Sequence, residues 1–284
     1  MKFRPKQANG DVNVPKTHPL VEMAWLAGGL ALIIASIYLF LTFLTGWIVA
    51  VLPVEAEVWI GKKILQNDPG MPCEPLQKRL NDLVDYLPQD SPLRKYQFSV
   101  RVVDSNLVNA VALPGGTIVV FSKLLKEINS ENELSMILAH ELGHYAHRDH
   151  LKRLGKGLIF GAASWFIFRD SSQPLLMPFV VVMDARYSQA QEEKADLWGL
   201  ELLNKRYGHV GGAVDFFQRL LEKKDVGKLT HFLASHPHPK KRIEKLVSTA
   251  RNKGYPIGKT EPIGEDIKEF LEKCCSKPLP KSED

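Results

Sequence analysis

The pentapeptide His140-Glu141-Leu142-Gly143-His144 is the stretch around which this 284-residue chain is organised. We expect residues 130–153 to form one helix, on which His140 and His144 project from the same face one turn apart. Two imidazoles so placed can hold one tetrahedral zinc ion, and Glu141 stands where a carboxylate can take a proton from water on the metal. The same pattern also arises by chance on amphipathic helices. A zinc site can therefore be assigned only if the rest of the chain supplies a third ligand and a substrate site.

The start of this helix is marked in the sequence. Ser130 and Glu133 have the spacing of a capping box, directly before a run of apolar residues. Glu131 and Glu133 also favour the positive end of the helix dipole. The two histidines therefore fall in the interior of the predicted helix.

The composition indicates a folded protein without nucleic-acid features. Apolar residues make up 45% of the chain, enough for a globular core, and the formal net charge is +5. The densest basic cluster has the spacing of a solvated helix face and lacks interleaved aromatic residues, so we expect no nucleic-acid partner. This cluster consists of Lys240, Lys241, Arg242 and Lys245.

The three cysteines, Cys73, Cys274 and Cys275, do not form a disulfide framework, because their number is odd and two are adjacent. A bridge from Cys73 to the tail is possible in an oxidising compartment. None of the three has the spacing of a metal ligand, so cysteine is excluded from the expected zinc site.

The N-terminal region predicts a membrane anchor. Residues 1–18 form an expected flexible basic tail, and residues 19–54 an expected transmembrane helix, with no charged residue from 23 to 54. Trp25 lies near one end, and Trp47 and Trp59 near the other, as interfacial residues do. A cleaved signal peptide is the alternative, but its apolar region is about 7–15 residues long, shorter than this one.

The charges beside the anchor predict its orientation. Four basic residues precede the span, whereas Glu55 and Glu57 come before Lys62 and Lys63 on the other side. The positive-inside rule then places the tail in the cytoplasm and the remaining chain on the non-cytoplasmic, periplasmic side.

The rest of the chain predicts an α+β fold that is mainly helical with a small antiparallel sheet. Residues 55–72 form an expected amphipathic connection, 73–255 the domain and 256–284 a C-terminal tail. Apolar spacing and turn residues predict strands at 98–103, 108–113 and 117–121, and helices at 75–87, 184–206, 211–224, 240–252 and 265–274. Two apolar runs, 157–168 and 174–183, are shorter than a membrane span and predict a buried or interfacial hairpin.

Two candidates compete for the third metal ligand. His150 lies ten residues after His140, as in metzincin sites, but His147 replaces the glycine that turns the chain in those sites. On a straight helix His150 would lie about 15 Å from His140 along the axis. The other candidate is a carboxylate of the helix at 184–206, where Glu192 and Asp196 share a face. One could bind zinc while the other orients a ligand histidine.

At these positions the chain resembles the membrane metallopeptidases of the HtpX and CAAX prenyl protease group, especially their single-anchor, periplasm-facing members, which are gluzincins. The resemblance covers residues 75–250 and rests on four blocks in order: Asn109-Ala-Val-Ala-Leu-Pro-Gly-Gly116, His140 to His144, Ser188 to Asp196, and Ser235-His236-Pro237 with Arg242. Many members of the group have arginine where this chain has Gln189.

The resemblance implies a zincin-like fold and a role for each block. It implies that Glu192 is the third zinc ligand, that Asp196 supports the site, and that His236 helps to stabilise the oxyanion of the tetrahedral intermediate. It also implies that an extended substrate lies along an edge strand formed by Asn109, Ala110, Val111 and Ala112.

Together these features predict a membrane-anchored, zinc-dependent metalloendopeptidase with one zinc ion per chain, acting on proteins or peptides and bound to the bilayer through its N-terminal helix. The resemblance implies a role in protein quality control. Two alternatives remain: a membrane-tethered chaperone or binding module with weak or no hydrolysis, and a metzincin-like protease with His150 as third ligand.

Overall fold

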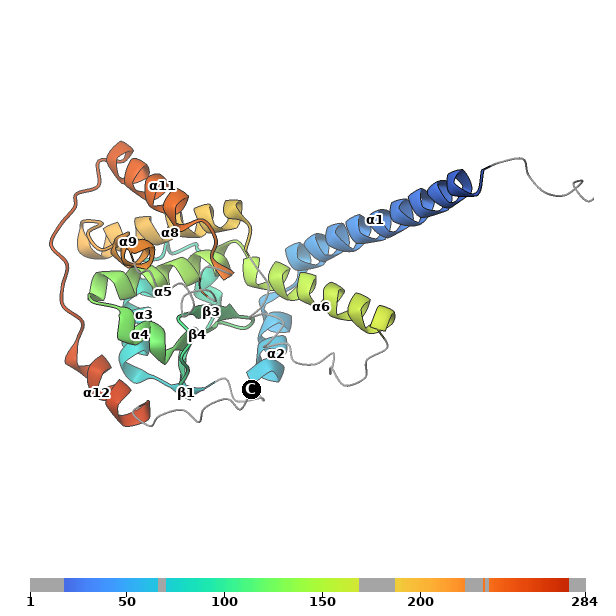
Figure 1. Ribbon diagram of the computed structural model, residues 1–284. Coiled ribbons are helices and arrows are strands. Elements are labelled where there is room, and N and C mark those ends of the chain that lie inside the picture. The colour runs from blue at the N-terminus through green and yellow to red at the C-terminus, as the bar shows by residue number, and fades with distance from the viewer. Residues whose placement is uncertain (1–17, 66–69, 169–186, 223–231, 233–234, 276–284) are drawn as a thin grey trace, which may run out of the picture. The chain divides into compact units, whose positions relative to one another are not determined.

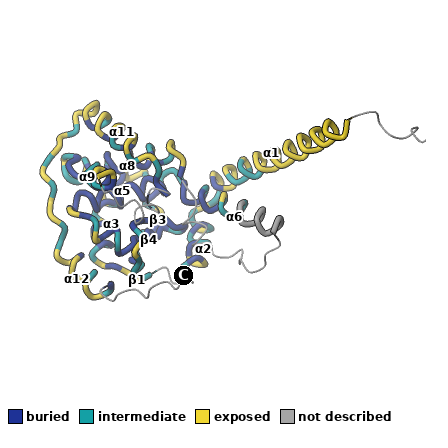
Figure 2. Tube along the Cα trace, viewed as in Figure 1, coloured by how far each residue is buried: buried dark blue, intermediate teal, exposed yellow. Residues whose placement is uncertain are grey.

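The computed structural model describes residues 18–65, 70–168, 187–222, 232 and 235–275 (Figure 1). The chain divides into two compact units, residues 1–44 and 45–284, each described here by itself. Helix α1 (Pro19–Val51) makes up the described part of the first unit and continues into the second. Among the described residues, α1 is the one helix long and apolar enough to cross a membrane. Its side chains are mostly exposed (Figure 2), unlike those of a buried core helix.

The second unit contains a sheet of four short strands: β1 (Met71–Pro72), β2 (Ser99–Val103), β3 (Ala110–Leu113) and β4 (Thr117–Phe121). The strand order is β1-β2-β4-β3, so β3 lies at one edge. A small sheet was predicted at the residues of β2, β3 and β4, and it is confirmed, whereas β1 lies in the segment expected as a connection. The predicted antiparallel arrangement holds for β3 with β4, but β2 and β4 are parallel; the added strand β1 is antiparallel to β2.

The parallel pairing follows from the loop after β2. In that loop the Asp104 carboxylate accepts a hydrogen bond from Ser122 Oγ at 2.7 Å, and Ser122 Oγ accepts one from the backbone N–H of Ser105 at 3.0 Å. Ser122 directly follows β4, so these bonds hold the loop across the end of that strand. The chain therefore enters β3 on the far side of β4, and returns through a turn in which Gly115 and Gly116 have positive φ angles.

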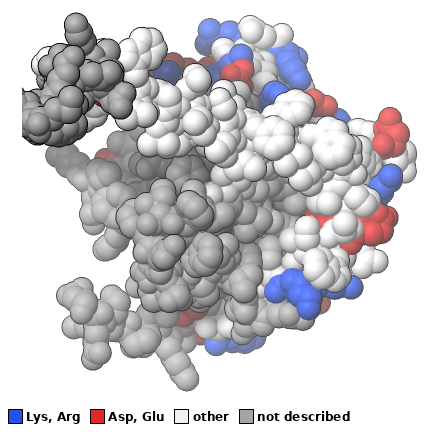
Figure 3. Space-filling view, turned by 90° about the vertical axis from the view of Figure 1, so that its right-hand side faces the viewer, with Lys and Arg blue, Asp and Glu red and all other residues white. Residues whose placement is uncertain are grey.

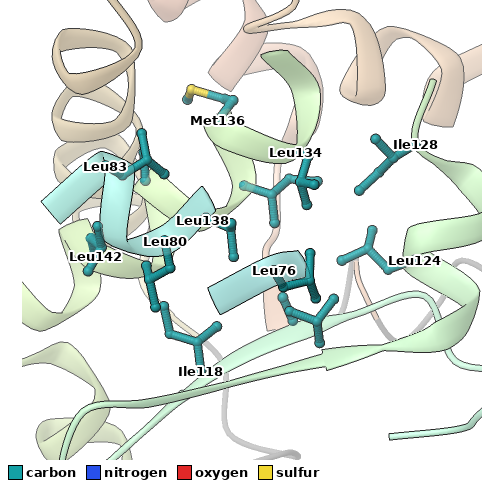
Figure 4. Close-up of a cluster of buried hydrophobic side chains, with 14 of the residues drawn as sticks. Leu76, Leu80, Leu83, Ile118, Leu124, Ile128, Leu134, Met136, Leu138 and Leu142 are labelled. Atoms are coloured by element: carbon teal, nitrogen blue, oxygen red, sulfur yellow. The ribbon is translucent and has the colours of Figure 1, made fainter. Parts of the chain in front are cut away.

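One face of the sheet is covered by α3 (Glu74–Asp85) and α5 (Glu131–Ala146), and their leucines form the main core (Figure 4). Short helices η1 (Pro92–Lys95) and α4 (Ser122–Glu127) flank this core. In Figure 4 Leu76 and Leu80 of α3 lie between the sheet residue Ile118 and Leu138 of α5. This packing fixes the position of α5, the helix that carries both motif histidines.

Helix α2 (Val54–Leu65) packs against the other face of the sheet. Alternate strand residues point to opposite faces, and the second core is accordingly made of Ile64, Val111, Leu113, Val119, Phe121 and Leu154. Backbones also touch, because a Cβ atom added to Gly61 would collide with the carbonyl oxygen of Pro114. Both faces of the sheet are therefore buried.

The helix with the two histidines ends earlier than predicted. Instead of one helix over 130–153, α5 ends at Ala146 and α6 (Asp149–Phe168) begins three residues later. Between them Arg148 has a left-handed backbone with φ 55°. Its guanidinium donates hydrogen bonds to the carbonyl oxygens of Val49 at 2.7 Å and Leu52 at 2.6 Å. These distant contacts offset the cost of a left-handed arginine, and no local sequence pattern reveals them.

The remaining helices are α8 (Gln189–Tyr207), α9 (Asp215–Glu222), α11 (Pro239–Asn252) and α12 (Glu265–Cys274). Helix α8 begins at a capping box between Ser188 and Gln191 rather than at residue 184. Within the segment expected as a C-terminal tail, Asp266 of α12 pairs with Arg79 of α3 at 2.7 Å. The apolar run at 174–183 lies outside the described residues. On the described part of the face in Figure 3, basic and acidic side chains are intermixed.

Candidate metal centre

Helices α5 and α8 approach closely enough for their side chains to share one site. A Cβ atom on Gly143 would lie 2.8 Å from the Cα atom of Ala195, so only glycine fits at this contact. The two helices therefore pack almost backbone to backbone. Both faces that meet here carry the residues predicted as metal ligands, and the Nε2 atoms of His140 and His144 are 3.1 Å apart.

Four buried side chains, His140, His144, Glu192 and His236, place one ligand atom each within 4.8 Å of all the others. Glu192 Oε1 lies 3.4 Å from His144 Nε2, and Glu192 Oε2 lies 3.7 Å from His140 Nε2. His236 Nδ1 lies 3.4 Å from His140 Nε2. Zinc bound tetrahedrally at about 2.0–2.1 Å requires ligand atoms about 3.3 Å apart. The spacing of these nitrogen and oxygen atoms fits that ion.

His236 enters the site from the segment before α11 and takes a place that the sequence did not predict. It was expected as a catalytic residue, yet its Nδ1 belongs to the group of ligand atoms, 3.0 Å from Glu192 Oε1. Its other nitrogen, Nε2, lies 3.9 Å from Glu141 Oε1. The geometry thus allows two roles, a fourth ligand through Nδ1 or a hydrogen-bond donor through Nε2. A closed four-residue site leaves no position for water, whereas a site with three ligands does.

Asp196 and Arg242 support the first histidine. Asp196 Oδ1 lies 2.9 Å from His140 Nδ1, so this carboxylate can fix the ring with Nε2 turned to the other ligands. Arg242 donates to both Asp196 oxygens, at 2.6 and 2.7 Å, and lies 2.6 Å from Glu192 Oε2. The sequence predicted that the basic cluster at residues 240–245 lies on a solvated helix face. This prediction is wrong for Arg242, which is 4% exposed, whereas the lysines of the cluster are exposed.

The second histidine has its own carboxylate, which sequence reasoning missed. Asp149 Oδ2 lies 3.5 Å from His144 Nδ1, and Asp149 Oδ1 accepts a hydrogen bond from Gln191 Nε2 at 2.9 Å. On the single straight helix predicted for this region, Asp149 would have pointed away from His144 by its spacing of five residues. The break at Arg148 turns it back.

The charges of the site balance one another. Burial opposes the ionised form of Glu192, but nearby His236 and Arg242 outweigh it and hold the pKa of Glu192 well below its usual range. Burial lowers the pKa of His140 and of His236. For His144 burial is outweighed by hydrogen bonds to Asp149 and Glu192, which raise its pKa to about 9. Because zinc binds a neutral imidazole, a proton held on the metal-facing nitrogen of His144 would leave as the cation binds.

His150 lies outside the group of ligand atoms. It is fully buried, and its Nε2 is 2.7 Å from Glu57 Oε1, a carboxylate of α2 that is itself fully buried. This geometry does not support His150 as the third ligand. The pairing joins segments 93 positions apart in the sequence, which no local pattern predicts.

Glu141 lies beside the ligand residues, and one of its carboxylate oxygens accepts no hydrogen bond from the described residues. It is 1% exposed, and its Oε2 has no hydrogen-bond partner among the described residues. A buried carboxylate oxygen without a partner is costly, and such atoms in native sites mark places where a ligand or water binds. Glu141 is the residue that the sequence predicts for proton transfer.

The predicted substrate strand is in place but covered. Strand β3 is an edge strand, as expected, yet Asn109, Ala110, Val111 and Ala112 are each at most 1% exposed. Asn109 Oδ1 accepts a hydrogen bond from Ser235 Oγ at 3.3 Å, which places the start of the strand next to His236.

Comparison with known proteins agrees with this arrangement. Residues 74–250 match the family model described as peptidase family M48. The bovine mitochondrial metalloendopeptidase OMA1 is 31% identical over 176 residues, covering 56% of this chain and 34% of the relative. The beta-barrel assembly-enhancing protease of Yersinia pestis is 27% identical over 195 residues, covering 63% and 39%.

A third relative is the metalloprotease YcaL of Escherichia coli, which is 30% identical over 146 residues, covering 49% of this chain and 57% of the relative. The chain spans roughly a third to a half of the length of the OMA1 relatives that it matches. The aligned segments, of 176, 195 and 146 residues, are each shorter than the second structural unit, residues 45–284.

Proposed function

Because the chain belongs to peptidase family M48, we propose that it hydrolyses internal peptide bonds with one zinc ion held by His140, His144 and Glu192. The observation that carries this proposal is the spacing of the buried ligand atoms, which suits tetrahedral zinc, with the unpartnered oxygen of Glu141 beside them. A module that only binds peptides has no need of that carboxylate.

The residues of the chain account for most of the steps. Bound zinc would supply positive charge that makes a nearby water acidic and polarises the scissile carbonyl. Glu141 would accept the proton of that water and pass it to the leaving nitrogen. Asp196 would keep the proton of His140 on Nδ1, so that Nε2 is free to bind. His236, when its ring carries a proton on Nε2, would donate a hydrogen bond to the carbonyl oxygen as it gains negative charge.

We propose that the substrate adds as an extended strand beside Asn109, Ala110, Val111 and Ala112. The edge position of β3 and the contact of Asn109 with Ser235, the neighbour of His236, support this placement. Because these strand residues are buried, binding would require the edge to become accessible first.

The substitution Glu141→Gln tests the proposed hydrolysis. We expect it to abolish cleavage of an unfolded protein substrate while the zinc content stays at one per chain. Glu193→Gln is the matched control, because Glu193 is on α8 next to Glu192 but pairs with Lys245 at the surface. Cleavage by Glu141→Gln at the wild-type rate would rule out the mechanism and favour a chaperone or binding module.

We further propose that α1 spans a membrane once and that the metal centre lies on the non-cytoplasmic side, as in the single-anchor group that the sequence resembles. We also propose that the protein acts in quality control of membrane or envelope proteins. The apolar length of α1 and the basic residues before it support the first part. A relative named for enhancing beta-barrel assembly supports the second.

Two experiments test this placement and role. In a Cys274→Ser background, a cysteine introduced at exposed Asp90 should react with a membrane-impermeant maleimide in intact cells, whereas the same background without it, which keeps only the buried Cys73 and Cys275, should not. Labelling only after lysis would reverse the orientation. Glu141→Gln in membranes should retain uncleaved substrates, and their identification would show whether they are misfolded envelope proteins.

A further inference from the structure

Tyr187 is part of the metal centre, although no sequence motif pointed to it. It directly precedes Ser188, the cap of α8, and its backbone N–H donates to the carbonyl oxygen of Ser235 at 3.2 Å. Its ring stacks on the ring of His144, with centroids 3.7 Å apart and planes 12° apart. The ring centroid of His236 lies 5.5 Å away. Tyr187 therefore packs between two residues of the site.

The hydroxyl hydrogen of Tyr187 has no acceptor among the described residues, although the residue is only 3% exposed; the guanidinium of Arg153, which lies 4.6 Å from the centroid of the Tyr187 ring, can only donate. Other buried tyrosines in this unit are satisfied: Tyr96 donates to Glu57 at 2.7 Å, and Tyr145 donates to the carbonyl oxygen of Thr117 at 2.8 Å. Phenylalanine would provide the same stacking on His144 without burying a polar atom. Packing alone therefore does not explain a tyrosine here.

Two atoms of side chains with a proposed catalytic role share this condition. Glu141 Oε2 and His236 Nε2 are also buried without hydrogen-bond partners in the described part of the chain. All three atoms belong to residues grouped around the ligand atoms of His140 and His144. Unpartnered buried groups gathered in one place indicate that their partners arrive with the reactants.

We infer that Tyr187 is a further catalytic residue, whose hydroxyl donates a hydrogen bond to the scissile carbonyl oxygen as that oxygen becomes negatively charged. A phenol is a donor suited to a developing oxyanion in a water-poor site. Tyr187 would act together with His236, from the side of the site formed by the start of α8. The inference rests on the proposed hydrolysis.

The competing explanation is that the Tyr187 ring only keeps His144 in place. Tyr187→Phe separates the two, because it removes the hydroxyl and leaves the ring. Tyr207→Phe is the matched control: the Tyr207 hydroxyl lies 3.0 Å from Ser135 Oγ, away from the ligand group, so that substitution removes a satisfied hydroxyl.

We expect Tyr187→Phe to lower kcat/KM by about 10- to 1,000-fold and to weaken binding of a phosphinic peptide, a mimic of the tetrahedral intermediate, to a similar degree. Zinc content should be unchanged, and the Tm of the metal-free protein should not fall. Tyr207→Phe should lower the metal-free Tm and leave kcat/KM at the wild-type value. Wild-type kcat/KM and inhibitor affinity in Tyr187→Phe would overturn the inference, as would loss of zinc.

The role of Tyr187 can be tested even if the proposed hydrolysis is wrong. If the wild type cleaves no substrate, the phosphinic peptide still reports on the hydroxyl through its Kd in calorimetry. A wild type that binds this peptide tenfold or more tightly than Tyr187→Phe supports the inference, and equal Kd values refute it. The activity of wild type against Glu141→Gln decides the proposed hydrolysis independently.

Discussion

The carboxylate of Glu57 lies 2.7 Å from Nε2 of His150, and both side chains are completely buried. The same carboxylate accepts hydrogen bonds from the Tyr96 hydroxyl at 2.7 Å and from the backbone N–H of Gly115 at 3.1 Å. His150 Nδ1 in turn lies 3.4 Å from the carbonyl oxygen of His144. The buried charge of Glu57 thereby holds together helix α2, the β3–β4 turn and the C-terminal end of α5, the metal-binding helix.

Removing that charge should destabilise the fold. Glu57→Ala leaves His150 and Tyr96 without their partner, and the loss of one member of a buried pair costs about 3–5 kcal/mol. Glu55→Ala, at an exposed position two residues earlier on α2, should change the free energy of unfolding by less than about 0.5 kcal/mol. Urea denaturation of the metal-free proteins measures both, and equal effects would contradict the role assigned to Glu57.

The same carboxylate should make stability depend on pH. Burial raises the pKa of Glu57, but the hydrogen bond and charge of His150 lead the interactions that outweigh it and lower the pKa from 4.5 to about 2. The stabilisation is complete above pH 4.5 and is lost as pH falls towards 2; a shift of this size corresponds to about 3 kcal/mol.

The substitution Glu57→Gln provides the comparison for this pH dependence, because glutamine does not titrate. The difference in free energy of unfolding between wild type and Glu57→Gln should shrink as pH is lowered from 6 to about 3. A difference that stays constant over this range would show that the charge of Glu57 does not contribute.

Asp149 should affect metal affinity without touching the metal. Asp149→Asn keeps the shape of the side chain but removes the negative charge beside His144 Nδ1. Loss of such a supporting carboxylate typically weakens metal binding by about 10- to 100-fold. Zinc competition with a chelator measures the change, with Asp90→Asn, an exposed position, as control. An unchanged affinity would mean that the 3.5 Å contact does not orient the histidine.

The third ligand can be tested by a pair of substitutions. Glu192→Ala should lose stoichiometric zinc, whereas His150→Ala should keep it while lowering the Tm, because Glu57 loses its partner. Zinc measured on the purified variants decides the matter. The opposite result, zinc lost from His150→Ala and kept by Glu192→Ala, would restore the metzincin-like arrangement.

Local sequence patterns were sufficient for the elements that carry the metal centre. The N-cap Ser130 accepts a hydrogen bond from the backbone N–H of Glu133 at 3.2 Å, as predicted, and the spacing of four residues placed His140 above His144 and Glu192 above Asp196 on their helices. These features depend on helix geometry alone. They do not place α5 against α8, and for that step the resemblance to a known group was required.

The parts that were missed depend on contacts between distant segments. Arg148 ends the metal-binding helix because it binds carbonyl groups near residue 50, and Asp149 reaches His144 only as a result. Arg242 is buried although its neighbours in the sequence are exposed, because two carboxylates of α8 surround it. Tyr187 has no distinctive sequence context. Such residues are identified by what surrounds them in space.

The contact of Gly61 with Pro114 has a practical bearing on protein production. A soluble version begun after Leu65 would omit α2, expose Val111, Leu113 and the other apolar residues of the second core, and remove the partner of His150. Such a fragment would be prone to aggregation. A start at Thr45 keeps α2 and the carbonyl groups bound by Arg148, and so respects the boundary of the folded unit.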